Sequence, residues 1–218
     1  MRNRTKKITT VAMLAAFAYV VMAVGRLPIT SVAFLKYDPK DVVIVIAGFI
    51  YGPLTSFLIS LVVSLLEMFT LSETGVIGLV MNVLSTCGFA CTAAFVYKRK
   101  RSFAGALTGL LAGCLVMTAL MLLWNFLITP LYMGQPRSDV ARMLLPVFLP
   151  FNLVKGGLNA GAALLLYKPV VTALRKSRLI EPETDAENRK NKNAGAILIG
   201  GLLLASCILF VLVMRGIL

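Results

Sequence analysis

The chain has 218 residues, of which 59% are hydrophobic and 14% are charged, and its mean hydropathy is +0.88. A soluble domain has about a quarter charged residues, so this composition excludes an ordinary soluble protein and predicts several helical membrane spans. The formal net charge of +13 would suggest a nucleic-acid partner in a soluble protein, but in a membrane protein the placement of the basic residues is more informative.

The first apolar segment runs from about residue 8 to residue 24 and follows a basic N-terminus. It is not followed by a cleavage-site pattern and a polar region, so we expect it to stay as a span. Ala12 and Ala16 give this segment a small-xxx-small face. Such a face allows another helix to approach closely, either within this chain or on a partner protein.

Residues 26–40 mix apolar and charged side chains, and Pro28 and Pro39 break helices. This segment is too polar to span a membrane and too apolar for a solvated linker. We therefore expect an ordered loop folded over the membrane end of the protein. Within it, Asp38 suits a turn before Pro39, and Asp41 suits the cap of the next helix.

Four apolar segments follow this loop. Residues 41–51 are short for a full span, and Gly52-Pro53 marks a break before residues 54–69, which carry Glu67 near their end. Residues 76–97 contain Asn82 and Ser85, and residues 103–129 contain Asn125 in their later half. A polar loop is expected over residues 130–142.

A sixth apolar segment covers about residues 143–167, and Pro146 and Pro150 predict an irregular start. Asn152 and Lys155 are three residues apart and lie on one helix face. Because lipid does not stabilise a bare Lys, this face should point to a protein cavity, a partner or a ligand.

The C-terminal part divides into a charged linker and a last apolar segment at residues 194–214, which we interpret as a simple membrane anchor. The sequence thus predicts an all-α, polytopic membrane helical bundle. Its parts are a six-span domain at residues 1–178, a linker at residues 179–193 and an additional transmembrane helix within residues 194–218.

The basic residues predict the orientation of the bundle. With the N-terminus inside, fifteen of the 22 Lys and Arg residues lie in cytoplasmic segments, which favours this topology. It places both irregular loops, together with Asn125, Asn152 and Lys155, toward the outer side of the cell membrane. The polar groups within the spans should therefore form one outward-facing site.

The chemistry of the sequence argues against an enzyme. It contains no His, no Walker loop and no pair of carboxylates inside the spans, and nothing in it activates Lys155 as a nucleophile. We interpret Cys87, Cys91, Cys114 and Cys207 as packing residues and expect no metal site. Active transport would need energy from another subunit or from an ion gradient.

The polar residues within the spans are better suited to binding a ligand than to catalysis. Asn offers a donor and an acceptor, and Lys offers donors. An apolar pocket around them, built with Phe34, Trp124, Phe126 and Phe151, would suit a flat heteroaromatic ligand with an amide-like edge. The alternative from the residues alone is that Lys155 neutralises Glu67 while the asparagines bridge helices.

Several motifs together resemble a known family. They are the Ala12-xxx-Ala16 face, the loop FLKYDPKD at residues 34–41 followed by AGFIYGP at 47–53, WNF at 124–126 and FNLVKG at 151–156. Over about residues 5–178 this pattern resembles the riboflavin-specific substrate-binding (S) subunits of energy-coupling factor (ECF) transporters, of the RibU type. The last apolar segment departs from the six-span body of that family.

The resemblance implies high-affinity riboflavin binding and uptake with a transmembrane coupling subunit and two cytoplasmic ATPases, without a cofactor. It assigns Ala12 and Ala16 to the coupling-subunit interface and assigns riboflavin binding to a second set: Asn125, Asn152, Lys155, Leu35, Lys36, Tyr37, Asp38 and Asn82. Two alternatives stay open. The ligand could be another vitamin or a flavin nucleotide, or the chain could be a membrane enzyme or assembly factor using Lys155.

Overall fold

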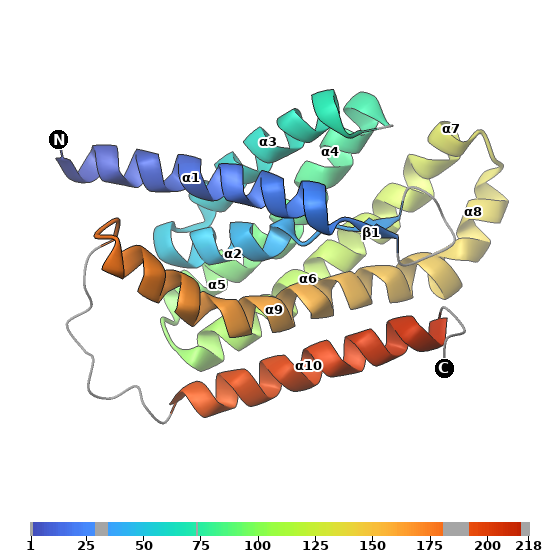
Figure 1. Ribbon diagram of the computed structural model, residues 1–218. Coiled ribbons are helices and arrows are strands. Elements are labelled where there is room, and N and C mark those ends of the chain that lie inside the picture. The colour runs from blue at the N-terminus through green and yellow to red at the C-terminus, as the bar shows by residue number, and fades with distance from the viewer. Residues whose placement is uncertain (1, 29–34, 73, 181–191, 215–218) are drawn as a thin grey trace.

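The structure is a computed structural model that describes residues 2–28, 35–72, 74–180 and 192–214. Its long helices lie roughly along one direction and form a bundle (Figure 1). The elements in chain order are α1 (Arg2–Gly25), β1 (Leu27–Pro28), β2 (Lys36–Tyr37), α2 (Lys40–Tyr51), α3 (Pro53–Thr70), α4 (Gly75–Thr86), the π-helix η1 (Cys87–Cys91), α5 (Thr92–Arg99), α6 (Phe103–Leu127), α7 (Thr129–Met133), α8 (Arg137–Met143), the π-helix η2 (Leu144–Phe148), α9 (Leu149–Lys176) and α10 (Lys192–Met214).

Six helical segments in the described part of the chain are long and apolar enough to cross a membrane. They are Arg4–Gly25, Pro53–Thr70, Gly75–Arg99, Phe103–Leu127, Arg137–Lys176 and Gly195–Val213. Many of their large apolar side chains are exposed, as expected where lipid is the solvent. The predicted all-α polytopic membrane bundle is therefore confirmed.

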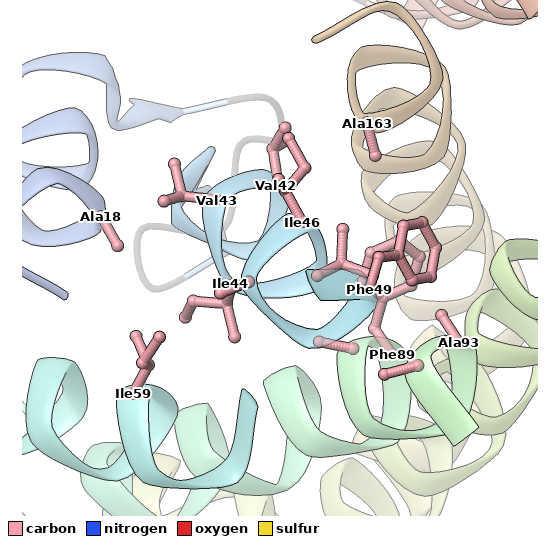
Figure 2. Packing of buried hydrophobic residues seen from close by; sticks show 14 of the residues in the cluster. Ala18, Val42, Val43, Ile44, Ile46, Phe49, Ile59, Phe89, Ala93 and Ala163 are labelled. Atoms are coloured by element: carbon pink, nitrogen blue, oxygen red, sulfur yellow. The ribbon is translucent and has the colours of Figure 1, made fainter. Parts of the chain in front are cut away.

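The short helix α2 forms the centre of the bundle. Ten of its twelve residues, Lys40 to Phe49, are buried. Figure 2 shows α2 surrounded by Ala18 of α1, Ile59 of α3, Phe89 of η1, Ala93 of α5 and Ala163 of α9. Because protein encloses it on several sides, α2 has a different environment from the lipid-facing helices. This burial explains its nearly continuous apolar sequence.

Glycine allows the close packing of α6 against η1 and α5. A Cβ atom at Gly109 would lie 2.7 Å from the carbonyl oxygen of Ala93. A Cβ atom at Gly113 would likewise press on the carbonyl oxygen of Phe89. Such backbone-to-backbone contact between membrane helices needs small residues at the interface.

The connections are more regular than the sequence suggested. The 26–40 segment contains an antiparallel pair of strands in which Leu27 pairs with Tyr37 and Pro28 pairs with Lys36. The 130–142 segment, expected as a polar loop, is largely helical in α7 and α8. Helix α9 extends to Lys176 in spite of Pro169, because an apolar face continues through buried Val171 and Leu174.

The irregular start expected from Pro146 and Pro150 is observed as η2, a wider helical turn that accommodates Pro146 within a continuous helical segment. The last helix, α10, packs against α9 and so contacts the body (Figure 1). The predicted linker at residues 179–193 lies mostly outside the described residues.

Candidate functional site

A cavity opens at the end of the bundle where α1 ends and α9 begins. Its empty volume is about 730 Å³, a figure that includes open solvent at its mouth. The walls come from the α1–α2 connection and from helices α3, α4, α6 and α9. The lining residues are Arg26, Leu35, Lys36, Asp38, Glu67, Leu71, Ser72, Thr74, Met81, Asn82, Ser85, Met121, Asn125, Phe151, Asn152 and Lys155.

Most residues expected to bind ligand meet at this cavity. Seven of the eight are on its wall, and they come from the α1–α2 connection, α4, α6 and α9: Leu35, Lys36, Asp38, Asn82, Asn125, Asn152 and Lys155. The eighth, Tyr37, lies elsewhere, and its hydroxyl donates a hydrogen bond to Oδ1 of Asn159 at 3.0 Å. These seven residues therefore lie on one cavity, and their role in ligand binding stays a prediction.

The two amides from α6 and α9 are oriented by their own helices. Nδ2 of Asn125 donates to the carbonyl oxygen of Met121 at 2.7 Å, and Nδ2 of Asn152 donates to that of Phe148 at 2.8 Å. The hydroxyl of Thr129 donates to Oδ1 of Asn125 at 2.8 Å. Each amide nitrogen carries a second N–H, so both side chains retain hydrogen-bonding capacity for a ligand. All three contacts join residues four apart in sequence, so they do not bridge helices that are distant in the chain.

Lys155 is part of a buried polar chain that links the cavity to α2. Its Nζ donates to Oγ of Ser85 at 3.2 Å and lies 3.6 Å from Oδ2 of Asp41. Asp41 also accepts from Thr86 at 2.7 Å and from Nδ2 of Asn159 at 3.3 Å. Asp41 therefore pairs with Lys155 inside the bundle. Its predicted role as a helix cap is wrong, because its side chain points to neighbouring helices.

Glu67 belongs to a second cluster, together with Arg26, Asp38 and Lys40. Arg26 and Lys40 both form ion pairs with Glu67, and Nε of Arg26 donates to Oδ1 of Asp38 at 2.7 Å. Nζ of Lys40 lies 3.7 Å from Oδ2 of Asp38. The suggested neutralisation of Glu67 by Lys155 is therefore wrong. Two cations and two carboxylates instead join the α1–α2 connection to α3.

Burial and charge act together on the groups of this connection. Burial alone would raise the pKa of Asp38, but the Lys40 ammonium and the hydrogen bond from Arg26 outweigh it and hold that pKa below its ordinary value. Burial raises the pKa of Tyr37, and the carboxylates of Asp41 and Asp38 add to the effect. Asp38 is therefore ionised and Tyr37 is neutral at physiological pH.

Sequence reasoning missed several cavity residues. Arg26 lines the cavity, and Lys40 belongs to the cluster around Glu67. Both were expected in an ordered loop over the membrane end, and nothing in their spacing indicates that both reach Glu67. Glu67 was the available signal, because an acid inside an apolar segment needs a cationic partner. Of the expected aromatic side chains, Phe151 lines the cavity, Trp124 lines a smaller neighbouring hollow, Phe126 is partly exposed, and Phe34 lies outside the described residues.

Ala12 and Ala16 lie together on the exposed side of α1. Met13, Phe17 and Val20 on the same helix are also exposed, whereas Leu14, Ala15 and Ala18 are buried. The small-residue face therefore points away from the body of this protein. It is free for lipid or for a partner helix.

Comparison with known proteins gives consistent matches. A sequence model of the family described as "ECF transporter, substrate-specific component" matches residues 6–167. The riboflavin transporter RibU of Staphylococcus aureus (strain TCH60) is 32% identical over 182 residues, covering 80% of this chain and 95% of that protein. The riboflavin transporter FmnP of Bacillus subtilis (strain 168) is 35% identical over 163 residues, covering 70% and 85%.

A solved structure is also similar. It is described as the S component of a bacterial ECF transporter, and it superposes with a TM-score of 0.67 at 31% sequence identity. The match covers 79% of this chain and 99% of the solved one.

Proposed function

Because the chain belongs to the family of substrate-specific components of ECF transporters, we propose that it binds riboflavin in the cavity and mediates its uptake. A component of a transporter is not an enzyme, in agreement with the chemistry of the sequence. The observation that carries the proposal is the convergence of Asn125, Asn152 and Lys155, from two helices, on one cavity.

The chemistry of riboflavin fits these side chains. The pyrimidine edge of the flavin alternates carbonyl groups with an imide N–H, which an Asn amide can complement with its own donor and acceptor. Lys155 has three N–H donors. One donates to Ser85 and the ammonium forms an ion pair with Asp41, so a further hydrogen bond to a ligand can be supplied. The flat ring system gains about 25 cal/mol per Å² of apolar area buried.

The partners proposed are a transmembrane coupling subunit and two cytoplasmic ATPases. No ATP-binding motif is present in the sequence, so energy for active transport has to come from another subunit or from an ion gradient, and the family favours another subunit. The exposed Ala12/Ala16 face of α1 is suited to close contact with a helix of the coupling subunit. Its position on the side of the bundle leaves the cavity accessible at the end.

We further propose that the N-terminus is cytoplasmic and that the cavity opens to the outside. Basic residues gather at the end of the bundle opposite the cavity, where Lys6 donates to the carbonyl oxygen of Arg178 at 3.4 Å. The basic run from Lys98 to Arg101 ends α5 and begins its connection to α6, and the last turns of α9 carry Lys168, Arg175 and Lys176; both lie at this same end (Figure 1). Such an excess of Lys and Arg marks the cytoplasmic side.

Riboflavin binding is tested directly with protein purified in mild detergent. The folded protein should quench riboflavin fluorescence at nanomolar to micromolar ligand, and protein from riboflavin-fed cells should be yellow. Asn152→Ala should weaken binding by about 1–3 kcal/mol, because a donor and an acceptor are lost. The neighbouring Leu153→Ala, at an exposed apolar position, is the matched control and should bind normally.

A competition series then defines the ligand. Flavin mononucleotide and unrelated vitamins are added to riboflavin-loaded protein, and displacement is followed by fluorescence. Riboflavin should compete best. A folded sample that binds another vitamin but not riboflavin would overturn the proposed ligand.

A further inference from the structure

Helix α10 lies outside the region that defines the family, since the family match ends at residue 167. It nevertheless runs antiparallel to α9 and lies beside it along much of its length (Figure 1). Helix α9 carries Asn152 and Lys155, so α10 covers the back of a helix that forms the cavity wall.

The contact between α9 and α10 depends on glycines. A Cβ atom at Gly200 of α10 would lie 3.1 Å from the carbonyl oxygen of Gly161, and one at Gly157 of α9 would lie 2.6 Å from Sγ of Cys207. A Cβ atom at Gly161 would lie 2.8 Å from Cγ of Leu204. Two backbones that approach this closely gain van der Waals packing along the contact. A helix that served only as a lipid anchor would not need it.

The opposite side of α10 is apolar and exposed. Ile197, Leu198, Leu202, Ile208 and Leu209 point away from the bundle. This side is suited to lipid tails, whereas the glycine side is shaped to α9. The helix thus has one narrow side packed on α9 and a broad side suited to lipid.

We propose that α10 is a permanent part of the binding body and stays docked on α9. It then moves with the body through the transport cycle and blocks access of the coupling subunit to this side of α9. The proposal rests on the proposed function for its transport step. It leaves the α1 side, with Ala12 and Ala16, as the small-residue surface open to the coupling subunit.

The location of the glycines connects α10 to the site. Gly157 follows Lys155 by two residues, and Gly156 between them packs against Cys114 of α6. Helix α9 is therefore held between α6 and α10 directly below the cavity. If α10 left during transport, the groove at Gly157 and Gly161 would lose its packing partner beside the binding residues.

A disulfide tests the docking in the full-length protein. The variant Gly157→Cys places a thiol next to native Cys207, and copper–phenanthroline is the oxidant. A protease site inserted at residue 186 allows the chain to be cut between α9 and α10. On a denaturing gel without reductant, the two fragments should stay joined after oxidation.

The controls for this test are a reducing agent, which should separate the fragments, and Gly157→Cys combined with Cys207→Ser, which should not cross-link. If Gly157→Cys does not fold, the pair Gly161→Cys and Leu204→Cys probes the same contact. Failure of both pairs to cross-link in folded protein would overturn the docking. This readout does not require riboflavin to be the ligand.

Transport by the cross-linked protein tests whether the helices stay together. Riboflavin uptake with the ECF module should remain within about twofold of the reduced protein. Loss of uptake on oxidation, with riboflavin binding intact and recovery on reduction, would show that α10 must leave α9. Loss of binding by both oxidised and reduced protein would instead count against the proposed function.

Two adjacent glycines provide a matched pair. Gly200→Leu places a side chain against Gly161, Leu164 and Leu165, whereas a Cβ atom at Gly201 meets nothing within 4 Å. In the Gly157→Cys background, Gly200→Leu should lower the cross-linked fraction severalfold, and Gly201→Leu should leave it unchanged. Equal cross-linking in the two variants would contradict the glycine contact.

Discussion

Nζ of Lys155 lies 3.6 Å from Oδ2 of Asp41, at the boundary between the cavity and the central helix α2. One partner comes from the wall of the binding site and the other from the core of the bundle. Removing Lys155 therefore has two consequences, one for ligand binding and one for folding, and an experiment has to separate them.

Lys155→Met should lower the free energy of unfolding by about 3–5 kcal/mol, because Asp41 is left buried without its cation. The double variant Asp41→Asn, Lys155→Met removes both charges and should recover most of that loss while riboflavin binding stays weak. Unfolding in detergent and fluorescence titration measure the two effects. A double variant as unstable as the single one would contradict the pairing.

Glu67→Gln should destabilise the protein more than a surface change, because Lys40 and Glu67 are only 1% and 2% exposed. The amide leaves Lys40 and Arg26 with an incomplete set of partners, at a cost of about 3–5 kcal/mol. The melting temperature in detergent checks this. Asp139→Asn, at an exposed position of α8, is the control and should shift stability by no more than about 0.5 kcal/mol.

The folded-state pKa of Asp38 lies below its ordinary value of 3.8, so the ionised carboxylate stabilises the folded state at neutral pH. This contribution is fully present above that ordinary value and is lost as the pH falls through the folded-state pKa. Stability measured from pH 7 to pH 3 should therefore fall at the acid end. In Asp38→Asn the fall should be smaller, and an identical pH profile would exclude Asp38 as its source.

Gly109→Ala should destabilise the bundle by about 1–3 kcal/mol, because the added methyl group presses on the carbonyl oxygen of Ala93. Gly201→Ala has open space around it and should be neutral or stabilising by up to about 1 kcal/mol, since Ala favours helix. Thermal melts of the two variants should shift in opposite directions or differ clearly. Equal melts would contradict the close packing of α6 on α5.

Ala16→Trp should abolish riboflavin uptake with the ECF module and leave riboflavin affinity unchanged, because the bulky ring blocks close approach of a partner helix. The control Leu198→Trp, on the exposed side of α10, should transport normally. Uptake assays and binding titrations give the two readouts. Normal uptake by Ala16→Trp would exclude this face as the coupling surface.

The helical membrane bundle and seven of the sixteen residues that line the cavity could be predicted from the sequence and its family resemblance. Apolar length identified the spans, and a polar face in an apolar segment identified Asn152 and Lys155, because lipid penalises such groups unless protein or ligand pairs them. The basic residues then placed Asn125 at the same end of the bundle. These signals lie within single segments of the sequence, or in the unequal distribution of Lys and Arg between the two sides of the membrane.

The pairing of buried charges could not be predicted. Lys40 and Asp41 are adjacent in sequence, yet Lys40 reaches Glu67 and Asp41 reaches Lys155. Which partner each side chain meets depends on how α2 is rotated between α3 and α9, and one sequence does not encode that rotation as a pattern. The same limit applies to Tyr37, which turns toward Asn159 and away from the cavity.

The enclosure of α2 also has a consequence for how the protein enters the membrane. At 1.5 Å per residue its twelve residues extend about 18 Å, well short of the roughly 30 Å hydrocarbon layer, and its first turn carries Lys40 and Asp41. Transfer of such a short segment from the insertion machinery into lipid by itself is only weakly favourable. We expect it to be released together with α1 and α3, so that the centre of the bundle is assembled during biosynthesis and the lipid-facing helices close around it.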